Sequence, residues 1–166
     1  MKSMWMMLAT LLIHASAGAG AIVQYERSYE AHFELHNQVE YHTIAIYAGA
    51  GDLRIWTDSY NGGIGLDPII TLWHNGARVA FNDDDQTVDP LYQSKRDAGL
   101  VLFALPHGTY VVTITAYPNF ARSASLGDGF AFDSQSPIVI DTWCQPGNPG
   151  PGCHSDRHIS LHWSVK

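Results

Sequence analysis

Residues 67–85 read DPIITLWHNGARVAFNDDD, and this stretch decides the fold class. Two short apolar runs flank Asn75 and Gly76, the dipeptide that most readily adopts the positive φ angles of a tight hairpin turn. The second run ends directly on the acidic segment 82–85, which reads Asn-Asp-Asp-Asp. Three adjacent carboxylates repel one another, so they indicate either a well-solvated loop or a bound cation that offsets the repulsion.

Period-two alternation of apolar and polar residues continues along the chain, and no segment shows a sustained helical period. Besides the hairpin, the alternating segments are 29–36, 43–47, 53–57, 99–105, 109–117, 137–143 and 158–165. A second hairpin is expected through Pro106, His107 and Gly108, between two of these segments. The pattern predicts an all-β fold, an antiparallel, jelly-roll-like β-sandwich of about eight or nine strands. Residues 83–98 and 119–136 exceed ordinary hairpin loops and are candidate functional loops.

The amino terminus has the features of a secretory signal peptide over residues 1–21. Lys2 is followed by an apolar run too short to span a bilayer, and small residues then allow cleavage after Ala17 or Ala21. No later segment is long and apolar enough for a membrane span. We therefore expect residues 22–166 to form one exported domain, secreted, periplasmic or at the cell surface. The net charge of -7 argues against a nucleic-acid partner.

Two cysteines, Cys144 and Cys153, flank a loop rich in proline and glycine. In an oxidising compartment this arrangement predicts a disulfide bond. The alternative is a metal site that includes His154, although zinc sites normally show a tighter paired spacing.

The acidic segment has two further aspartates near it in sequence. Asp58 and Asp67 bracket the glycine-rich turn 61–65, which can bend sharply and offer backbone carbonyls. If the strand ends bring this turn beside the acidic segment, an oxygen-rich site forms, and such sites favour calcium over zinc. The spacing is not that of an EF-hand, since Val88 and Ser94 stand where glycine and glutamate are required. The alternative is a solvated turn whose side chains cap backbone amides. The candidate metal ligands are Asp58, Asp67, Asn82, Asp83, Asp84 and Asp85.

Four segments recur in the same order in one known family: 51–55 (GDLRI), 67–72 (DPIITL), 80–84 (AFNDD) and 105–112 (LPHGTYVV). Over residues 33–117 the chain resembles the bacterial pre-peptidase C-terminal (PPC) type of β-sandwich and its relatives in exported proteins that often carry a PEP-CTERM sorting tail. The resemblance implies a compact accessory domain, which in some members binds calcium and then substrate. It implies metal roles for Asp67, Asn82, Asp83 and Asp84, whereas Asp58 and Asp85 are included for their proximity. Because no attached peptidase and no PEP-CTERM tail is recognisable, we expect a free-standing version.

Histidines form a second group. His32 and His36 share one strand face, and His158 and His162 share a face of the last segment. First and last strands of sandwiches are often neighbours, which would gather four imidazoles able to bind a transition metal or respond to mild acid. The alternative is a polar outer face, because residues four apart on a strand lie about 13 Å from each other.

No catalytic motif is present. The chain lacks a Gly-x-Ser-x-Gly elbow, a His-Glu-x-x-His motif and a phosphate-binding glycine loop, so we assign no catalytic residue and predict that it is not an enzyme. Trp56 and Tyr60 are weak candidates for stacking on a sugar, whereas Trp73 and Trp163 fit core packing. The alternatives are therefore a carbohydrate-binding module and a secreted hydrolase without a recognisable motif.

Together these features predict a non-catalytic, calcium-stabilised binding or structural domain that acts in adhesion. Its partner would be an extracellular protein, matrix or glycan. Calcium would order the acidic loop and stiffen one end of the sandwich.

Overall fold

The computed structural model describes residues 27–146 and 156–166. The strands are β1 (Arg27–His32), β2 (Glu40–Thr57), β3 (Pro68–His74), β4 (Ala77–Asn82), β5 (Gly99–Ala116) and β6 (His158–Val165). Three short 3-10 helices, η1 (Asn61–Gly63), η2 (Leu126–Asp128) and η3 (Ile140–Thr142), lie in the connections. The predicted signal peptide falls outside the described residues. In those ranges, no helix is long and apolar enough to cross a membrane.

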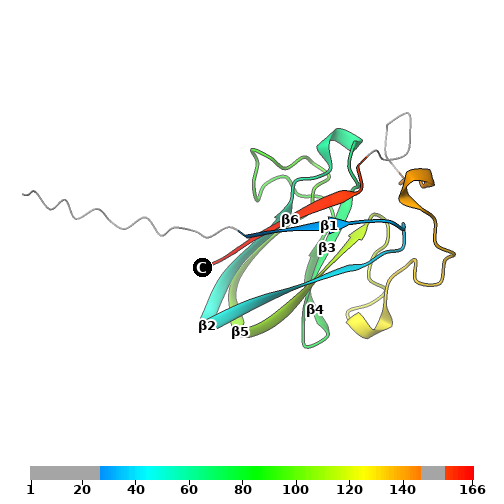
Figure 1. Cartoon of the computed structure of the whole chain (residues 1–166). Coiled ribbons are helices and arrows are strands. Elements are labelled where there is room, and N and C mark those ends of the chain that lie inside the picture. The colour runs from blue at the N-terminus through cyan, green and yellow to red at the C-terminus, as the bar shows by residue number, and fades with distance from the viewer. Residues whose placement is uncertain (1–26, 147–155) are drawn as a thin grey trace, which may run out of the picture.

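The strands form one antiparallel sheet in the order β1-β6-β2-β5-β3-β4, which confirms the all-β, antiparallel prediction. Strands β2 and β5 run side by side as a long curved ribbon (Figure 1). The first part of β2 pairs with the last part of β5, which also pairs with β3. The last part of β2 pairs with the first part of β5 and with β6. Register shifts between Ile46 and Ala50, and between Gly51 and Leu53, mark the bend at which the sheet folds over into two layers.

The described residues contain six strands, fewer than the eight or nine or so predicted for the chain. Segments 43–47 and 53–57 belong to the single strand β2, and 99–105 and 109–117 overlap the single strand β5. The hairpin predicted through Pro106 and Gly108 does not form. Instead Pro106 pairs with Ala50 and Gly108 with Ile46, at the irregular part of the ribbon where proline and glycine are tolerated. Segment 137–143 is mostly irregular and contains η3.

The hairpin predicted from Asn75 and Gly76 is confirmed. Strands β3 and β4 pair on either side of this dipeptide, whose φ angles are 52° and 77°. Positive φ at both central residues is what a two-residue hairpin turn requires, and Asn-Gly supplies it with little strain.

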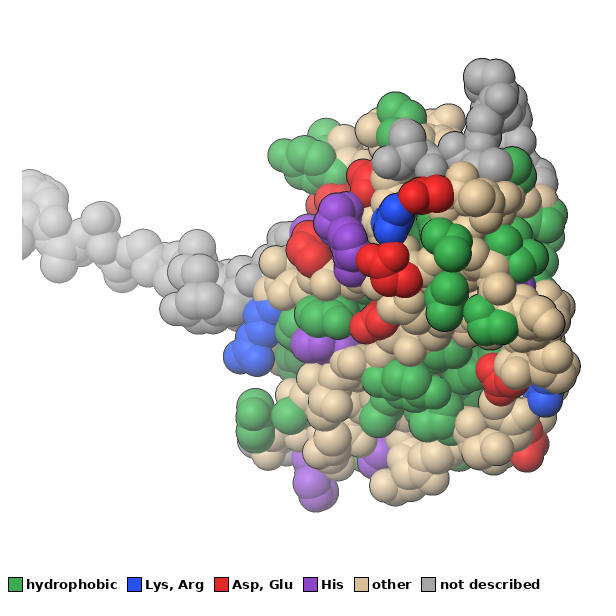
Figure 2. All heavy atoms as spheres, turned by 45° about the vertical axis from the view of Figure 1, so that its right-hand side comes forward, with side chains coloured by type: hydrophobic (Ala, Val, Ile, Leu, Met, Phe, Trp, Pro, Cys, Tyr) green, Lys and Arg blue, Asp and Glu red, His purple; other side chains and the backbone are tan. Residues whose placement is uncertain are grey.

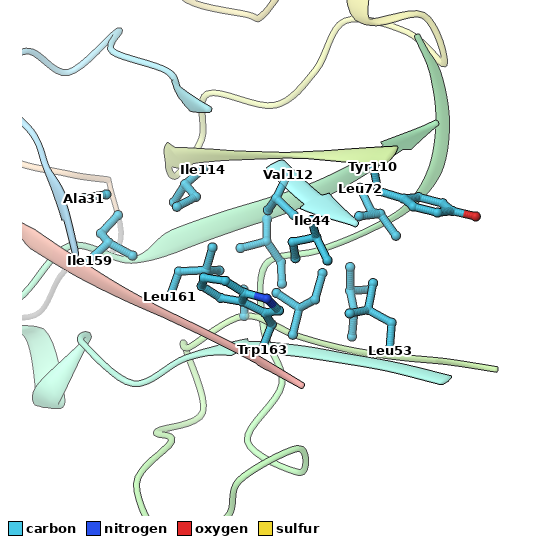
Figure 3. Packing of buried hydrophobic residues seen from close by; sticks show 14 of the residues in the cluster. Ala31, Ile44, Leu53, Leu72, Tyr110, Val112, Ile114, Ile159, Leu161 and Trp163 are labelled. Carbon is cyan, nitrogen blue, oxygen red and sulfur yellow. The ribbon is translucent and has the colours of Figure 1, made fainter. Parts of the chain in front are cut away.

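The hydrophobic core lies between the two layers. Figure 3 shows Leu161 and Trp163 of β6 facing Val112 and Ile114 of β5, with Ile44 of β2 beside Val112. The predicted burial of Trp73 and Trp163 is confirmed, at 1% and 7% exposure. Trp73 lies on the other face of its layer, where its Nε1 donates to Thr113 Oγ1 at 2.9 Å.

Only one of the two cysteines of the predicted disulfide belongs to the described residues. Cys144 is described, while Cys153 lies outside the described residues, and the described part of the chain contains no free cysteine. The Cys144–Cys153 disulfide therefore stays a prediction.

Candidate functional site

The fold brings Asp67 close to the acidic segment. Asp67 immediately precedes β3, Asn82 ends β4, and the register of this pair sets Ile70 opposite Asn82. The start of one strand therefore meets the end of its neighbour. A pocket of about 370 Å³ opens there, lined by Asp67, Asp83, Asp84, Lys95, Arg96 and Tyr117.

Asp67 is the buried residue of this pocket, with 3% of its surface exposed. Its backbone is fixed by Gln145, whose Oε1 accepts from Asp67 N and whose Nε2 donates to Asp67 O, both at 2.9 Å. Asp67 Oδ2 accepts a hydrogen bond from Arg96 Nη1 at 2.7 Å. Asp67 Oδ1 is buried and has no hydrogen-bond partner among the described residues. A buried carboxylate oxygen without a partner is costly, so this atom calls for an explanation.

The electrostatics of the pocket follow from this burial. Burial, with a smaller contribution from the charges of Asp84 and Asp83, raises the pKa of Asp67 from 3.8 to about 6, in spite of the opposing Arg96 guanidinium. Burial also raises the pKa of Asp83, again with a contribution from Asp84. Asp84 is exposed. Three carboxylates and two cationic side chains thus share one pocket, and the acidic groups are in excess.

The side chains that line the pocket do not, as they are placed, form a complete metal site. Nowhere in residues 27–146 and 156–166 are three His, Cys, Asp or Glu side chains placed to hold a metal ion together. The carboxylates of Asp67, Asp83 and Asp84 are oxygen donors of the kind that calcium prefers, and the orphan Oδ1 would gain a partner. Arg96, however, already occupies Oδ2. A bound cation would have to draw the side chains of Asp83 and Asp84 toward Asp67.

The other three predicted ligands do not line the pocket. Asn82 Oδ1 accepts from Gly99 N at 3.0 Å, which ties the end of β4 to β5. Asp85 Oδ1 accepts from the backbone N and the Oγ1 of Thr87, at 2.7 and 2.6 Å, as a turn-capping residue does. Asp58 Oδ2 lies 3.2 Å from His162 Nε2, against β6. The structure therefore brings together Asp67, Asp83 and Asp84, and leaves Asp58, Asn82 and Asp85 in other contacts.

Sequence reasoning missed the residues that hold the loop 83–98. Asp97 is fully buried, and its Oδ1 accepts from Tyr60 N and Thr57 Oγ1 at 3.1 and 3.2 Å. Its Oδ2 accepts from the N and Oγ of Ser94, at 2.7 and 2.8 Å. Burial raises the pKa of Asp97, while these hydrogen bonds oppose the rise. The three-residue spacing of Ser94 and Asp97 is a local capping pattern that could have pointed to this role.

Gln93 completes the internal support of the loop. Its Nε2 donates to Asp85 O and Ala98 O at 2.8 and 3.1 Å, and its Oε1 accepts from Asp89 N at 2.7 Å. Arg54 Nη2 also donates to Val88 O. The base of the loop is thus fixed to strands β2 and β5 by the protein's own hydrogen bonds.

The two weak sugar-binding candidates are buried. Trp56 is 3% exposed and stacks on His162, with ring centroids 5.5 Å apart, and Tyr60 is 4% exposed. Stacking on a sugar needs an accessible ring face, so the structure contradicts the placement on which this interpretation of Trp56 and Tyr60 depends. The exposed aromatic side chains are others, with Tyr47 and Phe103 the most exposed of them, at 85% and 72%.

The histidines are only partly gathered. Strands β1 and β6 are neighbours, as expected of first and last strands, and His32 lies opposite His158. His36 is instead buried, and its Nε2 and Nδ1 contact Gln135 Oε1 and Ile138 N, each at 3.1 Å. His162 lies in the middle of β6, opposite Trp56 of β2 and beside Asp58. Of the two alternatives, the surface of four imidazoles is not formed, and a pair remains.

No protein-family model and no curated protein matches the chain. A crystal structure of Aeromonas hydrophila PliG, a periplasmic lysozyme inhibitor of g-type lysozyme, is 13% identical, with a TM-score of 0.45 over 88% of this chain and 90% of that one. The pre-peptidase C-terminal domain of collagenase from Bacillus anthracis is 12% identical, with a TM-score of 0.42 over 85% and 89%. A distant structural likeness to a PPC domain is thus found, while the link to PEP-CTERM proteins stays a prediction.

Proposed function

We propose that this chain is an exported, non-catalytic binding domain whose acidic pocket takes a calcium ion. The observation that carries the proposal is Asp67 Oδ1, a buried carboxylate oxygen without a hydrogen-bond partner, in a pocket that Asp83 and Asp84 also line. A cation there would give this oxygen a partner and would offset the repulsion among the three carboxylates. Calcium suits such a site because it accepts oxygen ligands in irregular geometry.

Calcium would act on a small part of the loop. Gln93 and Asp97 already hold the loop base, so the ion is not needed to fold it. The side chains of Asp83 and Asp84 would move toward Asp67, and calcium would fix the end of β4 against the start of β3. The same loop exposes Leu91 and Tyr92, at 86% and 70%, and this apolar tip supports binding to an extracellular protein or matrix.

The metal part of the proposal is tested by calcium titration of the purified chain after chelator treatment, followed by calorimetry and thermal unfolding. A ligand at about 100 times its dissociation constant stabilises the folded state by about 2.7 kcal/mol. Asp84→Asn is the decisive variant, because Asp84 is exposed and lines the pocket, so its loss should spare the fold. Asp89→Asn, in the same loop but outside the pocket lining, is the matched control.

We expect calcium to stabilise the wild type and Asp89→Asn equally and to stabilise Asp84→Asn much less. No calcium-induced shift in the wild type would refute the metal site, and an equal shift in Asp84→Asn would place the ion elsewhere. The partner is sought by binding to matrix proteins and to glycans, measured with calcium and with chelator. Partner binding that is equally strong with calcium and with chelator would mean that the partner does not depend on calcium in the pocket.

A further inference from the structure

A histidine pair stands at the edge of the sheet, away from the acidic pocket. His32 ends β1 and His158 begins β6, and the two residues are direct partners in the antiparallel register. Their ring centroids are 4.2 Å apart, with an angle of 68° between the ring planes. The two side chains are 52% and 51% exposed, so solvent and small ions reach both rings.

Two histidines on neighbouring strands can lie much closer together than two histidines four residues apart on one strand. Side chains at i and i+4 of one strand lie about 13 Å apart, whereas directly opposed residues have their Cβ atoms about 5 Å apart. Two imidazoles at this separation can turn their ring nitrogens toward a common point. Neutral imidazole is a preferred ligand of copper, nickel and zinc ions.

The groups around the pair orient one ring and supply negative charge. Asp156 Oδ1 accepts from His158 N at 3.0 Å and lies 2.8 Å from His158 Nδ1, so this carboxylate holds the ring by Nδ1 and leaves Nε2 available. A carboxylate on the second ring nitrogen is the usual support of a metal-binding histidine. Glu34 Oε1 lies 4.0 Å from His32 Nε2.

A single cation lies among these carboxylates in the described residues. Arg157 pairs with Glu34 at 2.6 Å and with Asp141. Two carboxylates thus pair with one guanidinium, and the carboxylate of Asp156 adds a third negative charge at His158, a balance that favours a further cation. Figure 2 shows a face of this kind, on which histidine side chains lie among Asp and Glu side chains and next to Lys or Arg.

We propose that His32 and His158 form a two-histidine site for a transition metal ion, with copper(II) bound most tightly. Since no third His, Cys, Asp or Glu of the described ranges is placed to share a metal with them, water completes the coordination. Copper(II) leads the divalent series for nitrogen ligands, which sets the expected order of affinity. The ion joins β1 to β6, and it binds the folded chain because only the fold brings the two nitrogens together.

The test is titration of the purified full chain with copper(II) and nickel(II), monitored by calorimetry and by the electron paramagnetic resonance signal of nitrogen-bound copper. His32→Ala and His158→Ala should each weaken copper binding about tenfold or more, because each removes one of two ligands. Asp156→Asn should weaken it about tenfold by releasing the His158 ring. His107→Ala is the matched control, since His107 is an exposed histidine of β5 that does not belong to the pair.

Folding of each variant is checked by its unfolding transition in chelator. The proposal predicts normal folding of all four variants, weakened binding in the first three and wild-type binding in His107→Ala. The proposal would be overturned if His32→Ala and His158→Ala both bound copper with wild-type affinity, or if His107→Ala lost as much affinity as they did. An absence of nitrogen-bound copper in the wild type would also overturn the proposal.

Discussion

Replacing Asp67 by Asn should remove one component of the pH dependence of folding. Burial raises the pKa of this carboxyl from 3.8 to about 6 in the folded chain, and Arg96 offsets the rise only in part. Because the folded pKa exceeds the unfolded value, the folded state holds the proton more tightly. The resulting stabilisation is complete below about pH 3.8 and is lost as the pH rises through 6.

The magnitude follows from the two pKa values. Each pKa unit corresponds to about 1.4 kcal/mol, so the shift of Asp67 is equivalent to about 3 kcal/mol over the whole range. Between about pH 7 and pH 5 the wild type should gain about 1.3 kcal/mol from this residue. An asparagine side chain does not titrate and gives no such gain.

Urea unfolding of both proteins in chelator, at a series of pH values from about 7 to 5, measures this quantity. The other titratable groups are common to both chains, so their contributions cancel in the difference between the two free energies of unfolding. That difference should change by about 1.3 kcal/mol in favour of the wild type as the pH falls. Parallel curves would refute the reasoning, because they would mean that the ion pair with Arg96 outweighs burial.

Four further substitutions test the packing and hydrogen bonding of the fold. Asp97→Asn should lower the free energy of unfolding by about 2 kcal/mol, seen as a lower urea midpoint. The reason is that an amide NH2 group, which donates, replaces one of the two buried carboxylate oxygens, which accept hydrogen bonds. Trp56→Ala should cost about 3–5 kcal/mol by thermal or urea unfolding, whereas Phe103→Ala, at an exposed position, should change the same midpoint by less than about 0.5 kcal/mol. Trp73→Phe removes the hydrogen bond to Thr113 and should lower the free energy of unfolding, measured by calorimetry, by about 1–2 kcal/mol. A loss below about 0.3 kcal/mol would mean that this hydrogen bond does not stabilise the fold.

The sequence predicted the local features of the fold and missed the long-range ones. The turn at Asn75 and Gly76 could be predicted because its conformation depends on the two residues themselves. The continuity of β2 and β5 could not, because Pro106 and Gly108 usually end a strand and are tolerated here only opposite an irregular stretch of the partner. Strand number was overestimated for that reason.

The candidate site was predicted to a similar extent. Asp67, Asp83 and Asp84 meet because the start of β3 lies beside the end of β4, and the hairpin implied this neighbourhood. The contact of Asp58 with His162 depends on β6 lying next to β2, more than 100 residues apart, and no local pattern reveals such a pairing. The spacing of Ser94 and Asp97 offered a local signal, but the burial of Asp97 could not be predicted, since its other partners come from residues 57–60.

The strand order also has a consequence for the order of synthesis. Strand β6 is the last described strand of the chain, and it lies between β1 and β2. In the described residues, β1 pairs only with β6, so β1 has no partner in the sheet until β6 has been made. Such distant pairing folds slowly, because a long loop must close before the contact forms. The layer therefore cannot close before β6 has been synthesised, and the edge histidine pair forms only after that point.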